Sequence, residues 1–171
     1  MTLPVLLIGS SVDTTWEKYT SQEGGFSILM PGTPGEKIQK VDMKIGEKYV
    51  KINMYMFLLQ RPGFSYMVVY NDMPQWNPED VDFILDSGRD RGIVSLKGKL
   101  LKEKDIWIDG HPGREIKIVG ADGFIYFSRM YLVKYRFYQV SVTTLGEDAS
   151  SPNVARFLNS FKLITPEEVE E

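Results

Sequence analysis

Apolar residues at every second position are the feature that most constrains how this sequence can fold. Successive side chains of an extended chain point to opposite faces, so alternation of this kind is typical of a β-strand. We expect residues 47–60 to form a strand with one fully buried side. The apolar members of that side are Val50, Ile52, Met54, Met56 and Leu58.

Turn-forming residues divide the rest of the chain into further runs of this kind. Pro31-Gly32, Pro34-Gly35 and Arg61-Pro62-Gly63 each interrupt a run, because Pro cannot donate to a strand ladder and Gly permits tight turns. Residues 36–43 and 47–60 flank Ile45-Gly46 as a predicted hairpin. The remaining predicted strands are 26–30, 64–71, 99–109, 114–119, 123–133 and 136–145.

A helix is predicted to begin after Asn77, because Pro78 then occupies the first helical position, where its missing N–H costs nothing. Gly92 is expected to end this helix or to weaken its last turn. Its apolar stripe consists of Val81, Ile84, Leu85 and Gly88. The opposite side is interpreted as a solvated face and carries Asp82, Asp86, Arg89 and Asp90.

A second helix is predicted near the end of the chain, with Ser151 as its cap and Pro152 in its first turn. A short closing strand is expected at 163–164. The apolar stripe of the helix consists of Val154, Phe157, Leu158 and Phe161. Strands, a helix, a strand meander and a final helix together indicate an α+β fold in which helices cover an antiparallel sheet.

The length of 171 residues suits one domain and is short for two, and we expect that domain to span residues 16–165. Residues 166–171 are predicted to form a disordered acidic tail, because they carry like charges and almost nothing to bury. Residues 1–15 are predicted to form a flexible arm. The alternative is the remainder of a truncated export signal, since the apolar run Leu3–Ile8 precedes the small residues Gly9-Ser10-Ser11. That run is far shorter than the roughly 20 apolar residues of a membrane-spanning helix, so no transmembrane segment is predicted.

The composition excludes several kinds of site. With no cysteine, the chain has no disulfide, thiolate metal site or cysteine nucleophile, and any histidine-based triad must use His111. The net charge is −3, and scattered Lys and Arg leave no electrostatic footprint for nucleic acid or an anionic membrane. Phosphate-loop, nucleophile-elbow and zinc-protease motifs are absent from the sequence. We therefore predict no nucleic-acid partner, no cofactor and no catalytic residues.

Two segments carry a resemblance to a known family. Residues 24–34 read GGFSILMPGTP, and residues 154–164 read VARFLNSFKLI. With the hairpins and the mid-chain helix, they make residues 16–165 similar to the PsbP-like superfamily.

The resemblance implies an α/β/α sandwich around an antiparallel sheet. It also implies a non-enzymatic role, which in photosynthetic members is that of lumenal subunits or assembly factors of photosystem II. Other similar chains are secretion-associated chaperones or proteins of unknown role. The resemblance implies an exported or lumenal location. Without the resemblance, we would expect a cytoplasmic location.

The segment Asp109–Glu115 brings an imidazole, a guanidinium and two carboxylates close together in sequence. Such a set could chelate a divalent cation or bind an anion. The Asp-Gly and Pro-Gly pairs are also what a structural turn requires, and His111 is then an exposed loop residue. We favour the structural interpretation, predict no metal, and keep His111 and Arg114 as candidate partner-binding residues.

Two Arg-x-Tyr pairs lie in adjacent predicted strands: Arg129 with Tyr131, and Arg136 with Tyr138. Their side chains could form a mixed aromatic and cationic surface that grips a partner carboxylate. Ordinary cross-strand packing, with the arginine stems lying along apolar surface, is the favoured alternative.

Methionines form a third candidate feature, because flexible thioether side chains can repack around different partners. They could line an adaptable apolar groove, although core filling is the favoured interpretation. The residues concerned are Met43, Met54, Met56, Met67, Met73 and Met130.

Taken together, these features predict a non-enzymatic accessory or assembly module whose partner is a protein. The alternative is a chaperone or carrier that shelters an apolar segment or a small ligand against its sheet.

Overall fold

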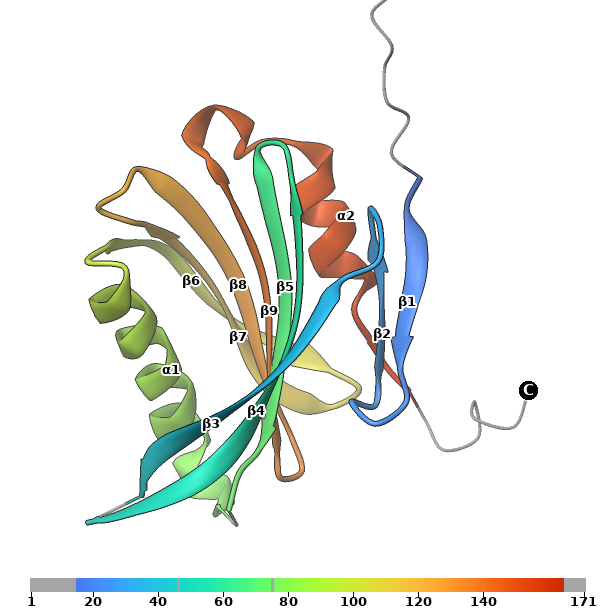
Figure 1. Cartoon of the computed structure of the whole chain (residues 1–171). Coiled ribbons are helices and arrows are strands. Elements are labelled where there is room, and N and C mark those ends of the chain that lie inside the picture. Colours follow the sequence, from blue (N-terminus) through green and yellow to red (C-terminus); the bar gives the residue numbers. More distant parts are fainter. Residues whose placement is uncertain (1–14, 46, 75, 165–171) are drawn as a thin grey trace, which may run out of the picture.

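The computed structural model describes residues 15–45, 47–74 and 76–164 (Figure 1). All of the predicted arm except Thr15, and all of the predicted tail, lie outside the described residues. The helices are α1 (Val81–Ser95) and α2 (Pro152–Ser160), with short 3-10 turns at Pro78–Asp80 and Gly146–Asp148. The strands are β1 (Glu17–Ser21), β2 (Phe26–Met30), β3 (Gly35–Ile45), β4 (Lys48–Arg61), β5 (Phe64–Asp72), β6 (Lys99–Ile108), β7 (His111–Val119), β8 (Phe124–Val133), β9 (Arg136–Leu145) and β10 (Lys162–Leu163).

A seven-stranded antiparallel sheet forms the centre of the molecule, in the order β3-β4-β5-β9-β8-β7-β6. Hairpins join β3 to β4 and β4 to β5, and the second half of the chain is the expected meander from β6 to β9. The two halves meet where β5 pairs with β9, from Phe64 opposite Thr144 to Asp72 opposite Arg136. At the β6 edge the register shifts between Leu100 and Lys102, which places a bulge there.

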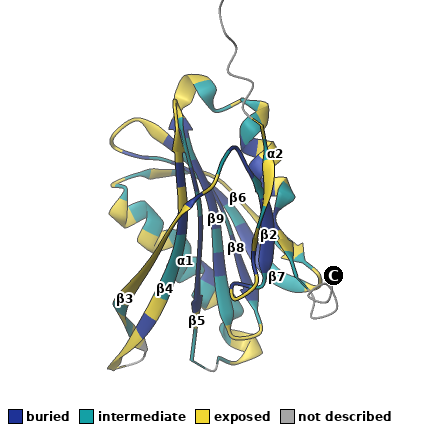
Figure 2. Cartoon of the chain, turned by 45° about the vertical axis from the view of Figure 1, so that its right-hand side comes forward, coloured by how far each residue is buried: buried dark blue, intermediate teal, exposed yellow. Residues whose placement is uncertain are grey.

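One face of this sheet is covered by α2 together with a small sheet of order β1-β2-β10 (Figure 1). The core between them is aromatic: Phe26 and Phe161 stack with ring centroids 5.6 Å apart, and Tyr131 and Phe161 stack at 5.8 Å. The Tyr138 hydroxyl donates a hydrogen bond to the Gly24 carbonyl at 2.6 Å. This bond ties the Tyr138 side chain of β9 to the turn before β2. Figure 2 shows the buried residues concentrated along β2 and the central strands.

The other face is covered by α1, which packs on β7 and β8. Leu85 of the helix is buried against Ile116, Ile118, Met130 and Leu132. Figure 1 shows α1 on the opposite side of the sheet from α2, near the β7 and β8 end. The part of this face formed by β3, β4 and β5 has no helix packed over it among the described residues.

Two local expectations were wrong. Burial in β4 changes face along the strand: Ile52 is buried in the first half, whereas Phe57 and Leu59 are buried in the second. The small sheet and α2 reach only the second half, so they bury the set of alternate residues opposite to the predicted one. The first helix also continues past Gly92 to Ser95 and ends where Lys97 takes a left-handed φ of 44°.

The α+β class with an antiparallel sheet is confirmed. The outer layer beside α2 also contains a three-stranded sheet, so a sandwich with helices alone on both sides stays a prediction. None of the helices in the described part of the chain has the length and apolar character that crossing a bilayer requires.

The aromatic core predicts the effect of truncating α2. Phe157 is fully buried, so Phe157→Ala should lower the free energy of unfolding by about 3–5 kcal/mol. Asn159→Ala, on the exposed side of the same helix, should change it by no more than about 0.5 kcal/mol. Urea denaturation followed by circular dichroism measures both. A loss below about 1 kcal/mol for Phe157→Ala would contradict the packing described.

Candidate functional site

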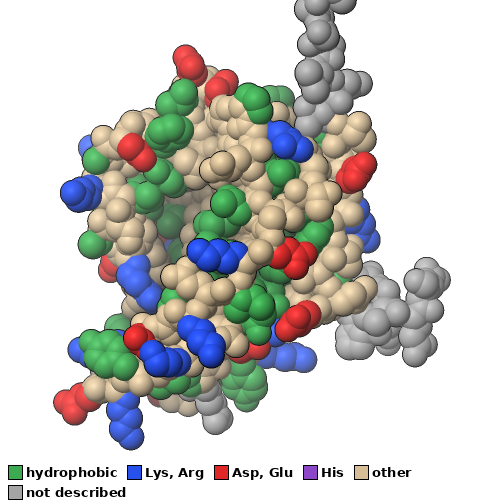
Figure 3. Space-filling view, in the orientation of Figure 1, with side chains coloured by type: hydrophobic (Ala, Val, Ile, Leu, Met, Phe, Trp, Pro, Cys, Tyr) green, Lys and Arg blue, Asp and Glu red, His purple; other side chains and the backbone are tan. Residues whose placement is uncertain are grey.

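A hollow of about 480 Å³ lies between α1 and the face of the central sheet that the helix leaves partly open. The hollow draws on β3, β4, β5, β7, β8 and β9 from the sheet and on the inner side of α1. Figure 3 shows the molecule hollowed near its centre, with hydrophobic side chains around the depression. Its volume lies within the roughly 300–1,000 Å³ of small-molecule pockets.

Methionines line this hollow from several elements. Five of the six methionines singled out in the sequence lie in its wall: Met43, Met54, Met67, Met73 and Met130. The exception is Met56. Met130 is buried in the core, as core filling predicts, whereas the other four are only partly buried. The groove interpretation, which the sequence alone did not favour, stays a prediction.

Strand periodicity puts these side chains on one face. On β5, Met67, Val69 and Asn71 all point into the hollow, because alternate residues share a face. On α1, Gly88 lets the helix approach closely, since a Cβ there would lie 2.8 Å from the Met130 sulfur.

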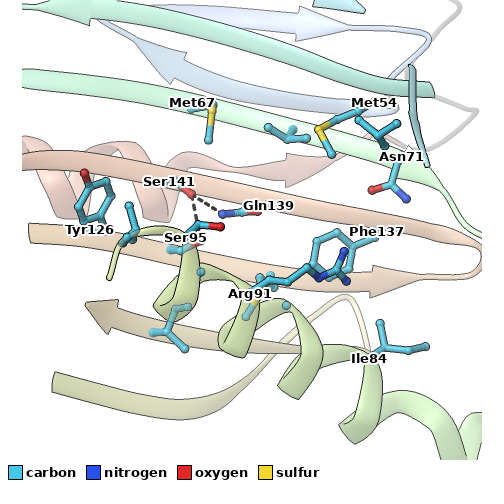
Figure 4. Close-up of a pocket in the computed structure, with 18 of the residues that line it drawn as sticks. Met54, Met67, Asn71, Ile84, Arg91, Ser95, Tyr126, Phe137, Gln139 and Ser141 are labelled. Atoms are coloured by element: carbon cyan, nitrogen blue, oxygen red, sulfur yellow. Dashed lines mark hydrogen bonds between the residues drawn. The ribbon is translucent and has the colours of Figure 1, made fainter. Parts of the chain in front are cut away.

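The floor carries a few polar groups among the apolar ones (Figure 4). The hydroxyls of Ser128 and Ser141 lie 2.9 Å apart, and Gln139 Nε2 donates to Ser141 Oγ at 3.3 Å. Asn71 differs from these residues. Its Nδ2 is the one buried side-chain polar atom in the described residues that lacks a hydrogen-bond partner.

The charge of the lining comes from two residues, Asp42 and Arg91. Asp42 is paired with Lys51 at 2.9 Å, whereas Arg91 has no ion-pair partner among the described residues. Burial, together with a hydrogen bond to Asp122, raises the pKa of Tyr126 to about 12, so this phenol stays neutral at physiological pH. Within the described part of the chain, Arg91 is therefore the charged lining residue that has no ion-pair partner.

Sequence reasoning missed Asn71 and Arg91. One signal was present for Asn71: it is a polar residue at an inward position of an otherwise apolar alternating run. The sequence contained no such signal for Arg91, because its place in the wall of the hollow depends on where α1 packs on the sheet.

The structure places the predicted site residues of the segment Asp109–Glu115 away from the hollow. Asp109 and Gly110 have positive φ and make the turn, and His111 is the half-buried first residue of β7 rather than an exposed loop residue. Arg114 is buried, with 7% of its surface exposed, and faces α1. Among the described residues, no group of three or more acidic or histidine side chains could hold a metal ion.

Arg114 is surrounded by carboxylates. Its guanidinium pairs with Asp86, with Glu103 at 3.1 Å, and with Asp82 and Asp105 at 3.3 Å each. Burial alone would lower the pKa of Arg114, but the hydrogen bond that it donates to Asp86 and the nearby carboxylate charges raise this pKa, so the side chain stays cationic.

The predicted solvated face of the first helix is therefore only partly solvated. Asp86 pairs with Arg114, and Arg89 reaches Glu103 of β6 at 2.8 Å. This side of α1 faces the β6–β7 hairpin, whose charges complement it. Helix periodicity alone contained no information about that neighbour.

The two Arg-x-Tyr pairs lie on the aromatic face. Tyr131 and Tyr138 face each other across β8 and β9 and are 5% and 3% exposed, so their rings belong to the core. Arg129 pairs with Glu115 at 2.7 Å, and Arg136 pairs with Asp72 at 2.6 Å and lies 4.5 Å from the centre of the Tyr70 ring. Neither tyrosine ring is open to a partner in this structure. A partner-binding role for the arginines stays a prediction.

Comparisons with known proteins bear on the fold. No protein-family model matches the sequence, and no curated protein matches it. The solution structure of cyanobacterial PsbP (CyanoP) from Synechocystis sp. PCC 6803 is similar with a TM-score of 0.60 and 12% identity, covering 91% of this chain and 96% of that chain. A Pseudomonas aeruginosa protein of unknown function, PA94, described as a putative regulator, has a TM-score of 0.44 and 17% identity, covering 68% of this chain and 90% of that one. The PsbP-like fold expected from the sequence is confirmed.

Replacing Arg114 should loosen α1. Arg114→Met leaves the carboxylates without their shared cation, and we expect a loss of about 2–3 kcal/mol, below the cost of a fully buried pair because Asp82 and Asp105 reach water. Lys51→Met removes the exposed pair with Asp42 and should cost less than about 1 kcal/mol. Chemical denaturation measures the free energy of unfolding of both variants. Equal losses of this free energy would mean that the Arg114 cluster adds nothing beyond a surface ion pair.

Loss of the ion pairs of Glu115 should make the folded state less stable at acid pH. Burial alone would raise its pKa, but hydrogen bonds and charge from Arg129 and Lys104 outweigh that effect and lower the pKa below its usual 4.5. The unfolded state then binds the proton more readily, so this stabilisation is present above the unfolded pKa and is lost as the pH falls through the folded one. Urea unfolding between pH 6 and 3 should show a shallower acid loss for Glu115→Gln than for the wild type. An unchanged slope would contradict the ion pair, and Glu17→Gln on exposed β1 is the control.

Proposed function

We infer that this chain is a non-enzymatic accessory module that acts by binding, and that the methionine-lined hollow is its binding site. The observation that carries this inference is the hollow of about 480 Å³, with five methionines in its wall. The PsbP-like resemblance supports the accessory part of the proposal and, with it, an exported or lumenal location.

The chemistry of the wall favours an apolar occupant. Methionine side chains are unbranched and polarizable, so they fit apolar groups of different shapes. The sheet is a rigid floor, because every strand under the hollow is paired on both sides except the edge strand β3. A rigid floor with an adaptable wall suits the carrier or chaperone interpretation, in which an apolar segment or a small ligand is held against the sheet.

A protein partner is the second candidate and is favoured by the outer side of α1. Phe83 and Val94 are 73% and 76% exposed. They are eleven residues apart, which puts them on the same side of a helix with 3.6 residues per turn. A protein contacting this side of the helix would cover two apolar side chains that the fold itself leaves in water.

A neutral fluorescent probe tests the proposal. N-phenyl-1-naphthylamine should bind the full-length chain with enhanced emission. Met67→Trp, which places an indole in the hollow, should weaken this binding at least tenfold. Met56→Trp is the matched control, because Met56 lies outside the hollow and should bind the probe as the wild type does. Circular dichroism establishes that both variants are folded. Absence of probe binding, or equal binding by both variants, would contradict the proposed site.

A further inference from the structure

Asn71 shows what kind of atom an occupant should offer. The residue is 4% exposed, it points into the hollow from β5, and its Nδ2 has no acceptor among the described residues. A buried donor without an acceptor costs stability, because it has given up hydration without replacement. The Nδ2 atom itself has almost no accessible surface, so an oxygen of a bound molecule reaches it only when the flexible side chains of the wall move aside. Such an oxygen would satisfy the donor, whereas a purely apolar molecule would not.

Arg91 shows what charge that oxygen should carry. Arg91 is an exposed residue that lines the hollow from α1, and within the described part of the chain it has no carboxylate partner. The other charged residue of the lining, Asp42, is neutralised by Lys51. Figure 4 shows the carboxamide of Asn71 and the guanidinium of Arg91 near the same end of the hollow, beside Phe137. An anionic oxygen at that end would meet a donor and a cation together.

The remaining lining fits a chain of methylene groups. Beyond the Asn71 end, the wall consists mainly of methionine and branched apolar side chains, including Met67 and Ile118. On the floor, Ser141 is hydrogen-bonded to both Ser128 and Gln139. A carboxylate beside exposed Arg91 keeps contact with water, so its binding avoids the full cost of burying a charge.

We propose that the hollow binds an amphipathic carboxylate of the fatty-acid class, with its carboxylate at Asn71 and Arg91 and its alkyl chain among the methionines. This inference rests on the proposed function, since it assumes that the hollow binds ligands. It adds the polarity and charge of the occupant and the end at which its head group lies.

Displacement of N-phenyl-1-naphthylamine by decanoate and by decanol at pH 7.5 tests the proposal. The two ligands have the same chain length and differ in charge. We expect the wild type to bind decanoate at least fivefold more tightly than decanol. Arg91→Gln should remove this preference and Arg91→Lys should keep part of it. Arg156→Gln, on exposed α2, should leave it unchanged.

The Asn71→Leu variant tests the head-group position independently of Arg91. The leucine has a similar size and no donor, so it should weaken both oxygen-bearing ligands without lowering the melting temperature. Equal affinity of the wild type for decanoate and decanol, a preference that survives Arg91→Gln, or unchanged affinity of Asn71→Leu for both ligands would overturn the head-group assignment while leaving the probe site intact. Stronger displacement by an apolar peptide with an amidated end than by decanoate would assign the hollow to a protein segment and overturn the fatty-acid class. Failure of the probe itself to bind would refute the proposed function as well.

Discussion

The position of α1 depends on one buried guanidinium. Arg114 of β7 reaches Asp82 and Asp86 on the helix, and the same cation pairs with Glu103 and Asp105 on β6. The helix is thereby tied to the β6–β7 end of the sheet and packs on β7 and β8. Because it is held there, it leaves the β4 and β5 side of the same face open, and the hollow is the result. The ion pairs and the hollow therefore go together with one placement of the helix.

The two faces of the central sheet are packed by different kinds of side chain. On the α2 side, rings from both sheets and the helix pack against one another, as Phe26 does with Phe57 at 5.3 Å and with Phe161 at 5.6 Å. Aromatic rings have few rotamers and defined contact geometry, so this side specifies one arrangement. On the α1 side, five methionines share the wall of the hollow with the rings of Tyr126 and Phe137. Methionine side chains are flexible, so this side allows several arrangements. The fold is thus fixed from one face, and the other is free to adapt to an occupant.

Much of this fold could be predicted from the sequence, because local rules decide it. Alternation and turn residues located the meander strands, and Ser151-Pro152 located α2, whose cap hydrogen bond from Asn153 is present. The β4 error had a non-local cause, since which face of a strand is buried depends on the layer that reaches it. The site was only half predictable. The methionines were visible as a set, but which of them share a hollow depends on the pairing of β5 with β9 and on the helix position. Neither has a sequence signature.

The edges of the central sheet limit how this protein can meet others. An unpaired strand edge invites another chain to add a strand, and lysines and bulges discourage such addition. Both edges carry these features: β3 has Lys37, Lys40 and Lys44, while β6 has Lys99, Lys102 and Lys104 beside its bulge. Self-association by edge-to-edge pairing is thereby disfavoured at both ends of the sheet. A chain with an open apolar face can in this way stay dispersed at high concentration, because its sheet resists the commonest route to aggregation.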